Sequence, residues 1–215
     1  MNVAILGQVG PQILSDGTMP VLRASKTGEL VVAELHGKYA EQTYRGNVFW
    51  ATMSVGVIFP APGAFFALPM TLTNPVGSGK NLNLISFDMV FTAIPGTPLT
   101  GLYGLYVNSL PTAAAVTGTA IPVQPGLIGS GYQPVGRAWS TSTLPSAATL
   151  LLPFATKVTG EVAAVVPILG ESSYHIDFDG RVALAPGTSI TPQMTAADTT
   201  NASVLCAFCW EEVLI

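Results

Sequence analysis

Two long stretches of this sequence, residues 46–79 and 89–136, contain no Asp, Glu, Lys or Arg. The whole chain has eight Lys and Arg and twelve Asp and Glu among 215 residues, whereas charged residues make up about a quarter of an ordinary soluble domain. So little charge predicts that much of the surface is covered, either by lipid or by other protein.

Proline argues against lipid. The first uncharged stretch contains Pro60, Pro62, Pro69 and Pro75, and the second contains six more prolines. A membrane-spanning helix needs about 20 mostly apolar residues in succession, and proline at this density removes backbone donors and breaks helices. Lipid would leave those backbone groups without partners. We therefore expect no membrane association and predict that other protein covers the chain, in a closed oligomer or on a larger shell.

Charge and the start of the sequence limit partners and location. The net charge is −4 and the pI is near 5.0, and the four basic residues before residue 46 are matched by four acidic ones. No basic stripe can form, so we expect no nucleic-acid partner. The first residues lack the charged and apolar regions of a secretory signal, which predicts synthesis in the cytoplasm.

Glycine, proline and β-branched residues predict an all-β chain with short strands and many turns. We expect an extended arm over residues 1–45 and one β-domain over residues 46–215. The strongest predicted strand is Lys80–Ala93. Leu82 and Leu84 share one parity and Phe87 the other, which predicts a β-bulge near Leu84–Ile85.

The final predicted strand, Ala202–Val213, is apolar on both faces. Alternate residues from Val204 to Trp210 would point one way, and the residues between them the other way. Such a strand is covered on both sides, either in the centre of a double layer or in a subunit contact. Cys206 and Cys209 would lie on opposite faces, too far apart for a disulfide, and are interpreted as two small buried hydrophobes.

The segment Leu110–Ser146 has one charged residue and is rich in Ala, Pro, Gly and Thr. It is long for a plain loop, and long loops usually carry a function or bind something. If it is a recognition surface, Tyr132 and Trp139 are an aromatic pair that could stack on sugar rings. A carbohydrate- or receptor-binding module is therefore one alternative.

Motifs for catalysis are weak, so we expect no enzyme and no cofactor. Residues 77–80, Gly-Ser-Gly-Lys, resemble a phosphate-binding loop but lack its spacing and following Ser or Thr, which favours a hairpin turn. Only His36 and His175 could serve as a histidine base, and no Gly-x-Ser-x-Gly elbow occurs. Scattered carboxylates leave a glycosidase-type pair open.

A metal site has one candidate. His175, Asp177 and Asp179 would alternate along one face of a strand. Three ligands on a single strand lack the second, converging strand that a metal site normally needs. We therefore favour a solvated strand end and expect no metal.

Aromatic residues near the end of the predicted arm are candidates for an interface, because Tyr, Trp and Arg dominate interface hot spots. The alternative is that these rings cap the core. The candidate interface residues are His36, Tyr39, Tyr44, Arg45, Phe49, Trp50 and Trp210.

Several stretches resemble tailed-bacteriophage virion proteins of the small β-sandwich type: residues 28–49, 74–82, 185–189 and 204–211. The resemblance implies an antiparallel, jelly-roll-like β-sandwich that acts as a capsid decoration (cement) protein. It implies a homotrimer that binds the major capsid protein or other virion proteins, and a location in the virion. A head–tail or tail component is the alternative within this class.

Overall fold

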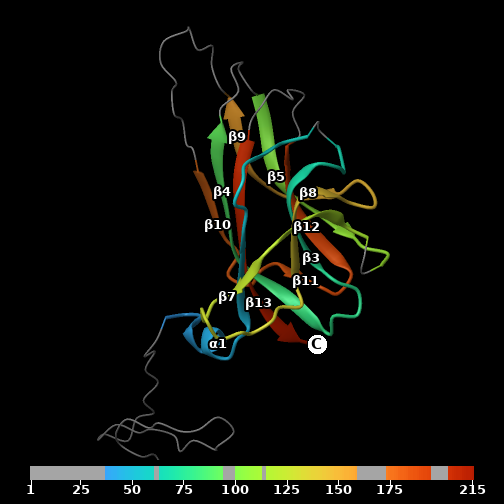
Figure 1. Ribbon diagram of the computed structural model, residues 1–215. Helices are drawn as coiled ribbons and strands as arrows, with labels where there is room; N and C mark the ends of the chain where they lie inside the picture. The colour runs from blue at the N-terminus through green and yellow to red at the C-terminus, as the bar shows by residue number, and fades with distance from the viewer. Residues whose placement is uncertain (1–36, 61–62, 94–99, 113–114, 159–172, 195–202) are drawn as a thin grey trace, which may run out of the picture. The chain divides into compact units, whose positions relative to one another are not determined.

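The computed structural model of this chain describes residues 37–60, 63–93, 100–112, 115–158, 173–194 and 203–215. The chain divides into two units, residues 1–40 and 41–215. Of the first unit only residues 37–40 are described. The second unit consists of two β-sheets that pack against each other (Figure 1).

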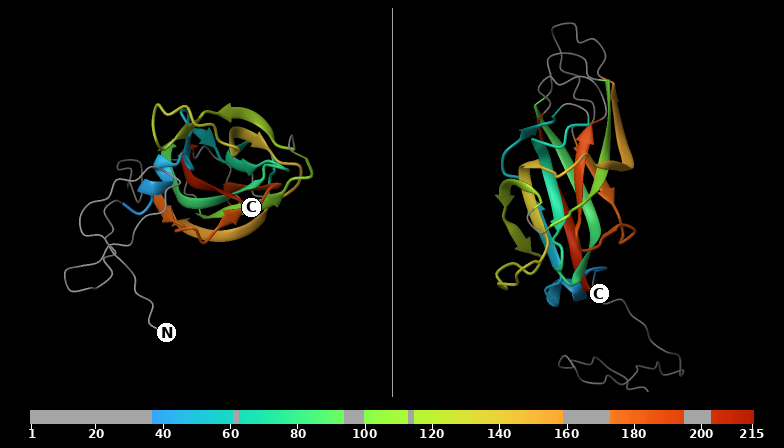
Figure 2. Two further views of the ribbon diagram at one scale, coloured as in Figure 1. Left: turned by 90° about the horizontal axis from the view of Figure 1, so that it is seen from below. Right: turned by 90° about the vertical axis from the view of Figure 1, so that its right-hand side faces the viewer.

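Seven strands of the described residues form the first sheet: β1 (Val48–Thr52), β2 (Val57–Ile58), β4 (Lys80–Ala93), β7 (Val123–Pro125), β10 (Ser173–Asp177), β11 (Ala183–Leu184) and β13 (Ser203–Leu214). Six form the second sheet: β3 (Leu68–Asn74), β5 (Thr100–Ser109), β6 (Thr117–Ile121), β8 (Arg137–Thr143), β9 (Thr149–Val158) and β12 (Thr188–Met194). Figure 2 shows the two layers from below and from the side.

The order of the strands defines a jelly roll. The first sheet runs β10-β4-β13-β1-β7 and the second runs β6-β8-β3-β12-β5-β9. Four antiparallel pairs are nested along the chain: β1 with β13, β3 with β12, β4 with β10, and β5 with β9. Successive pairs alternate between the two sheets, as in a long hairpin that is rolled up. The predicted all-β, antiparallel, jelly-roll-like sandwich is therefore confirmed.

The change of parity in β4 is a β-bulge, as predicted. Cys209 of β13 is opposite Ser86, but the next residue, Trp210, is opposite Leu84, so Ile85 has no partner on β13. The extra residue lets Leu84 and Phe87 both point into the core. The backbone carbonyl of Ile85 accepts a hydrogen bond from Phe178 N–H at 2.8 Å.

Strand β13 is central in the first sheet, between β4 and β1, which was one of the two predicted positions for it. Its core-facing side chains from Val204 to Trp210 are almost completely buried. The ring of Phe208 lies 4.7 Å from that of Phe87 on β4, centroid to centroid. Cys206 and Cys209 are free thiols and are buried, in agreement with their interpretation as small hydrophobes.

The segment Leu110–Ser146 is not a plain loop, since it contains β6, β7 and β8. It extends both sheets, because β8 pairs with β3 and β7 pairs with β1. It also supplies most of a second, smaller core formed by Leu68, Leu110, Val116 and Leu144, against which Trp139 packs. The composition of this segment shows neither strand alternation nor helical periodicity, so its strands were not predicted.

The connection between β3 and β4 is a turn, but it is not the predicted hairpin. β3 and β4 belong to different sheets, so residues 75–79 cross from one layer to the other. Gly77 and Gly79 have positive φ angles of 76° and 71°, a conformation that glycine adopts without steric cost. The Asn74 side chain donates to the carbonyls of Lys80 and Leu184, at 2.8 and 2.7 Å.

The predicted arm lies mostly outside the described residues, so its extended structure and its boundary at residue 45 stay predictions. Its last part forms a short helix, α1 (Ala40–Tyr44). Arg45 Nε lies 2.7 Å from Glu41 Oε1, and an i,i+4 pair in this order supports a helix.

Candidate functional site

The seven residues predicted for an interface have different surroundings. His36 lies outside the described residues. Tyr39, Tyr44 and Arg45 lie in or beside α1, Phe49 and Trp50 lie on β1, and Trp210 lies on β13.

Phe49 and Trp210 are core residues. Both side chains are almost fully buried, and their ring centroids are 6.2 Å apart. Trp210 also lies within contact distance of the backbone at Gly136, where an added Cβ would be 3.0 Å from its Nε1. Both rings therefore pack inside the protein. For Phe49 this is the alternative in which the aromatic residues cap the core.

The residues around α1 are more accessible. Tyr44 and Arg45 are exposed, whereas Tyr39 is half-buried with the Lys38 ammonium 5.2 Å from its ring centroid. With Trp50, which is 41% exposed, Tyr44 and Arg45 are the predicted interface residues whose side chains reach the surface. Their role in binding a partner stays a prediction.

The predicted trio of His175, Asp177 and Asp179 is wrong in one member. β10 ends at Asp177, and Asp179 lies in the following turn with a φ of 50°. His175 contacts two carboxylates: Asp177 on its own strand and, in place of Asp179, Asp88 on the adjacent strand β4. His175 Nδ1 lies 2.6 Å from Asp88 Oδ1, and Nε2 lies 3.2 Å from Asp177 Oδ1.

Asp88 was not predicted as a partner because it is far from His175 in the sequence, and nothing in the sequence indicates that β4 pairs with β10. The hydrogen bond to Asp88, followed by the charges of Asp88 and Asp177, raises the pKa of His175 above its ordinary value. In the described part of the chain, no group of three or more His, Cys, Asp and Glu side chains is arranged to hold a metal ion.

A groove lies beside Trp50, at the side of the sandwich where β7 adds to β1. Its volume is about 490 Å³, and twelve residues line it. Besides Trp50, the polar ones are Thr52, Ser54, Thr119, Gln124 and Ser140. The remaining six are apolar, and none of the twelve carries a charge. We call this feature the Trp50 groove.

Two β-ladders hold the walls of the Trp50 groove. On one wall Trp50 is directly opposite Gln124 in the β1–β7 pair, so both side chains project from the same face of the sheet. On the other wall Thr119 is opposite Ser140 in the β6–β8 pair. The Ser140 hydroxyl donates to the carbonyl of Thr119 at 3.4 Å.

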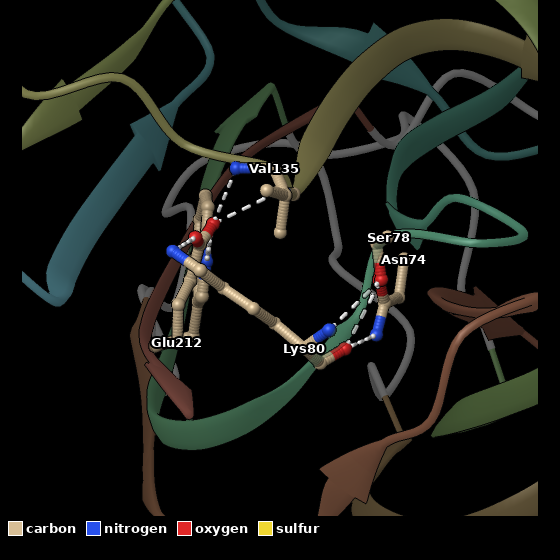
Figure 3. Close-up of polar contacts among 7 residues, drawn as sticks. Asn74, Ser78, Lys80, Val135 and Glu212 are labelled. Carbon is tan, nitrogen blue, oxygen red and sulfur yellow. Dashed lines mark hydrogen bonds and ion pairs between the residues drawn. The ribbon is translucent and has the colours of Figure 1, made fainter. Parts of the chain in front are cut away.

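The β7–β8 connection is fixed to β13 by a buried carboxylate, that of Glu212 (Figure 3). Glu212 is only 2% exposed. Its Oε1 accepts hydrogen bonds from the backbone N–H groups of Val135 and Gly136, at 2.7 and 2.9 Å. Its Oε2 lies 3.0 Å from Lys80 Nζ. This clamp fixes the chain immediately before β8 and so helps to fix the β8 wall of the Trp50 groove.

Sequence reasoning did not find Glu212 or Gln124. Glu212 has the same parity as the core-facing residues from Val204 to Trp210. This parity could have predicted that its carboxylate is buried. Gln124 had no comparable sign, because β7 has only three residues.

Tyr132 and Trp139, the predicted aromatic pair, have separate surroundings. Trp139 packs against the second core, and its indole N–H donates to Thr73 Oγ1 at 3.4 Å. The ring of Tyr132 lies against Gly46, where it would clash with an added Cβ.

The chain matches no protein-family model, no curated protein and no solved structure. No helix among the described residues is long and apolar enough to cross a membrane.

Proposed function

We propose that this chain is a structural virion protein, a decoration protein that binds the outside of a phage head as a homotrimer. The observation that carries the proposal is the exposure of large apolar side chains at one end of the sandwich. We call it the basal end, and it comprises the connections at residues 75–79, 126–136 and 185–187 together with the end of β13. Figure 1 shows the end of β13 and the C-terminus at the bottom of the view.

Large apolar side chains are exposed throughout the basal end. Ile128 is 87% exposed and Leu214 is 78% exposed, and Val76, Tyr132 and Val213 are also exposed. The three basal connections contain no charged residue. Clusters of exposed apolar side chains on soluble proteins mark surfaces that bind other proteins. A symmetric oligomer buries such a surface in each copy.

The fold and the site chemistry are compatible with this role. Jelly rolls occur in viral capsid proteins and in lectins, and a fold by itself does not define a function. Support therefore comes mainly from the surface. We propose a mechanical role without catalysis, in which many copies bound to the major capsid protein restrain the shell by avidity.

The molar mass in solution tests the oligomer. Light scattering on the purified chain is expected to give three times 22.3 kDa. Ile128→Glu and Leu214→Glu are expected to give monomers that keep the far-UV circular dichroism of the parent. Val90→Glu is the matched control, because Val90 is exposed on β4 away from the basal end. A parent protein that stays monomeric at high concentration would refute the homotrimer.

Labelled electron microscopy tests the location. Antibody bound over the heads of virions supports the decoration role. Antibody at the neck or tail shows that the protein is instead a head–tail or tail component, and particles without label refute the virion assignment.

A further inference from the structure

The Trp50 groove is separate from the basal end, and we propose that it binds a neutral carbohydrate. The inference does not depend on the virion role. It depends on the chemistry of the lining, on polar groups that lack internal partners, and on walls that are already formed.

The chemistry of the lining selects an uncharged, polyhydroxylated ligand. Trp50 presents an aromatic surface, and the apolar C–H face of a sugar ring packs well on such a surface. Hydroxyl and amide groups on Thr52, Thr119 and Gln124 can each donate to and accept from sugar hydroxyls. No Arg, Lys, Asp or Glu lines the groove, so it offers no counter-charge to a phosphate, a carboxylate or an ammonium group.

The two central polar groups are available to a ligand. Within the described part of the chain, neither the indole N–H of Trp50 nor the side-chain amide of Gln124 makes a hydrogen bond. Because these residues are cross-strand neighbours, both groups can reach one ligand. A ligand that bonds to them displaces only water and breaks no internal hydrogen bond.

The groove is also preformed and of suitable size. The β1–β7 and β6–β8 ladders fix its walls, and the Glu212 clamp holds the chain before β8. Its volume of about 490 Å³ lies within the range of small-molecule sites, roughly 300–1,000 Å³. A preformed site loses less conformational entropy when it binds.

NMR titration of the full chain tests the proposal through the three tryptophans. The probes are glucose, galactose, mannose, N-acetylglucosamine, maltose, cellobiose, lactose and chitobiose. At least one of them is expected to shift the indole N–H signal of Trp50 in a saturable manner. The indole signals of Trp139 and Trp210 are internal controls, since Trp210 lies in the main core, Trp139 packs against the second core, and neither lines the groove.

Variants locate the binding. Trp50→Ala and Gln124→Ala are each expected to weaken binding of that probe at least ~10-fold, which is the effect of losing about 1.4 kcal/mol of binding free energy. Trp50→Phe is expected to keep part of the affinity because an aromatic face remains. Tyr132→Ala is the control for an exposed aromatic residue outside the groove, and its affinity is expected to equal that of the parent.

Three results would each overturn the proposal: no probe shifts the Trp50 signal, binding persists in Trp50→Ala, or only charged ligands bind. The charged ligands used as probes are sialic acid and glucuronic acid. A proline-rich or aliphatic peptide that shifts the Trp50 signal when no sugar does would instead identify the groove as a peptide site.

Discussion

Glu212 at the end of β13 and Lys80 at the start of β4 form an ion pair, 3.0 Å between Oε2 and Nζ, on the inner side of the sheet. The other carboxylate oxygen accepts the N–H groups of Val135 and Gly136. One side chain therefore connects two strands of the first sheet with the connection that leads to β8. A buried carboxylate is stable only when its partners replace the water it has lost.

Removing this carboxylate is expected to destabilise the protein strongly. Glu212→Ala leaves two backbone N–H groups and the Lys80 ammonium without their acceptor. We expect the free energy of unfolding to fall by about 3–5 kcal/mol, measured by urea denaturation. Glu212→Gln is expected to lose less, because its carbonyl oxygen still accepts the two N–H groups.

The control for Glu212 is Glu41→Ala, which removes an exposed ion pair with Arg45. Exposed pairs contribute little, so the change is expected to stay below about 1 kcal/mol. Equal losses in the two alanine variants would contradict the clamp.

The pKa of His175 is expected to lie above its ordinary value in the folded protein, mainly because of the hydrogen bond to Asp88. A histidine whose pKa rises on folding stabilises the folded state below its unfolded pKa, and this contribution is lost as the pH rises through its folded pKa. The pair is exposed, so the effect on stability is small, and NMR titration of the imidazole is the appropriate measurement.

Asp88→Asn is expected to lower the pKa of His175 more than Asp177→Asn does, since Asp88 is the larger cause of its increase. A His175 titration that both variants leave unchanged would show that the two contacts do not form in solution.

Both cysteines are expected to be unreactive in the native protein. Burial, with a smaller contribution from Asp88, raises the pKa of the Cys209 thiol to about 12, and burial also raises the pKa of Cys206. The reactive thiolate is therefore scarce at neutral pH. Ellman's reagent is expected to detect no thiol before unfolding and two afterwards. Rapid reaction of either thiol in native buffer would contradict the burial of β13.

Gly136→Ala is expected to destabilise the protein by about 1–3 kcal/mol through overpacking. An added Cβ would lie 3.0 Å from both Leu82 Cδ1 and Trp210 Nε1, and these two side chains are fully buried, so neither can easily move. Gly37→Ala is the matched control, because no atom lies within 4 Å of its added Cβ. Thermal denaturation of the two variants should differ clearly, and equal midpoints would contradict the tight packing at Gly136.

Side-chain parity accounts for what could be predicted of the fold. It predicted the bulge at Ile85 and the core-facing series from Val204 to Trp210, because alternation in a strand is a local property. Which strands pair is not local. The turn at residues 75–79 has the same composition whether it closes a hairpin or crosses between sheets, and only the packing of β3 and β4 decides.

The candidate site was predictable only in part. Trp50 was selected because Tyr, Trp and Arg dominate interface hot spots, but the groove also needs Thr119 and Gln124, which belong to strands without clear alternation. The partner of His175 required the pairing of β4 with β10. Residues that act together across sheets cannot be identified from their spacing in one sequence.

The central position of β13 has a consequence for the order of folding. Its two neighbours, β4 and β1, have no ladder with each other in the described sheet, and β13 follows both by more than a hundred residues. During synthesis the first sheet therefore cannot close until β13 has left the ribosome. Such distant pairings fold slowly, in about milliseconds to seconds. Until then the halves of the first sheet expose unpaired edges, which makes this the period in which aggregation competes with folding.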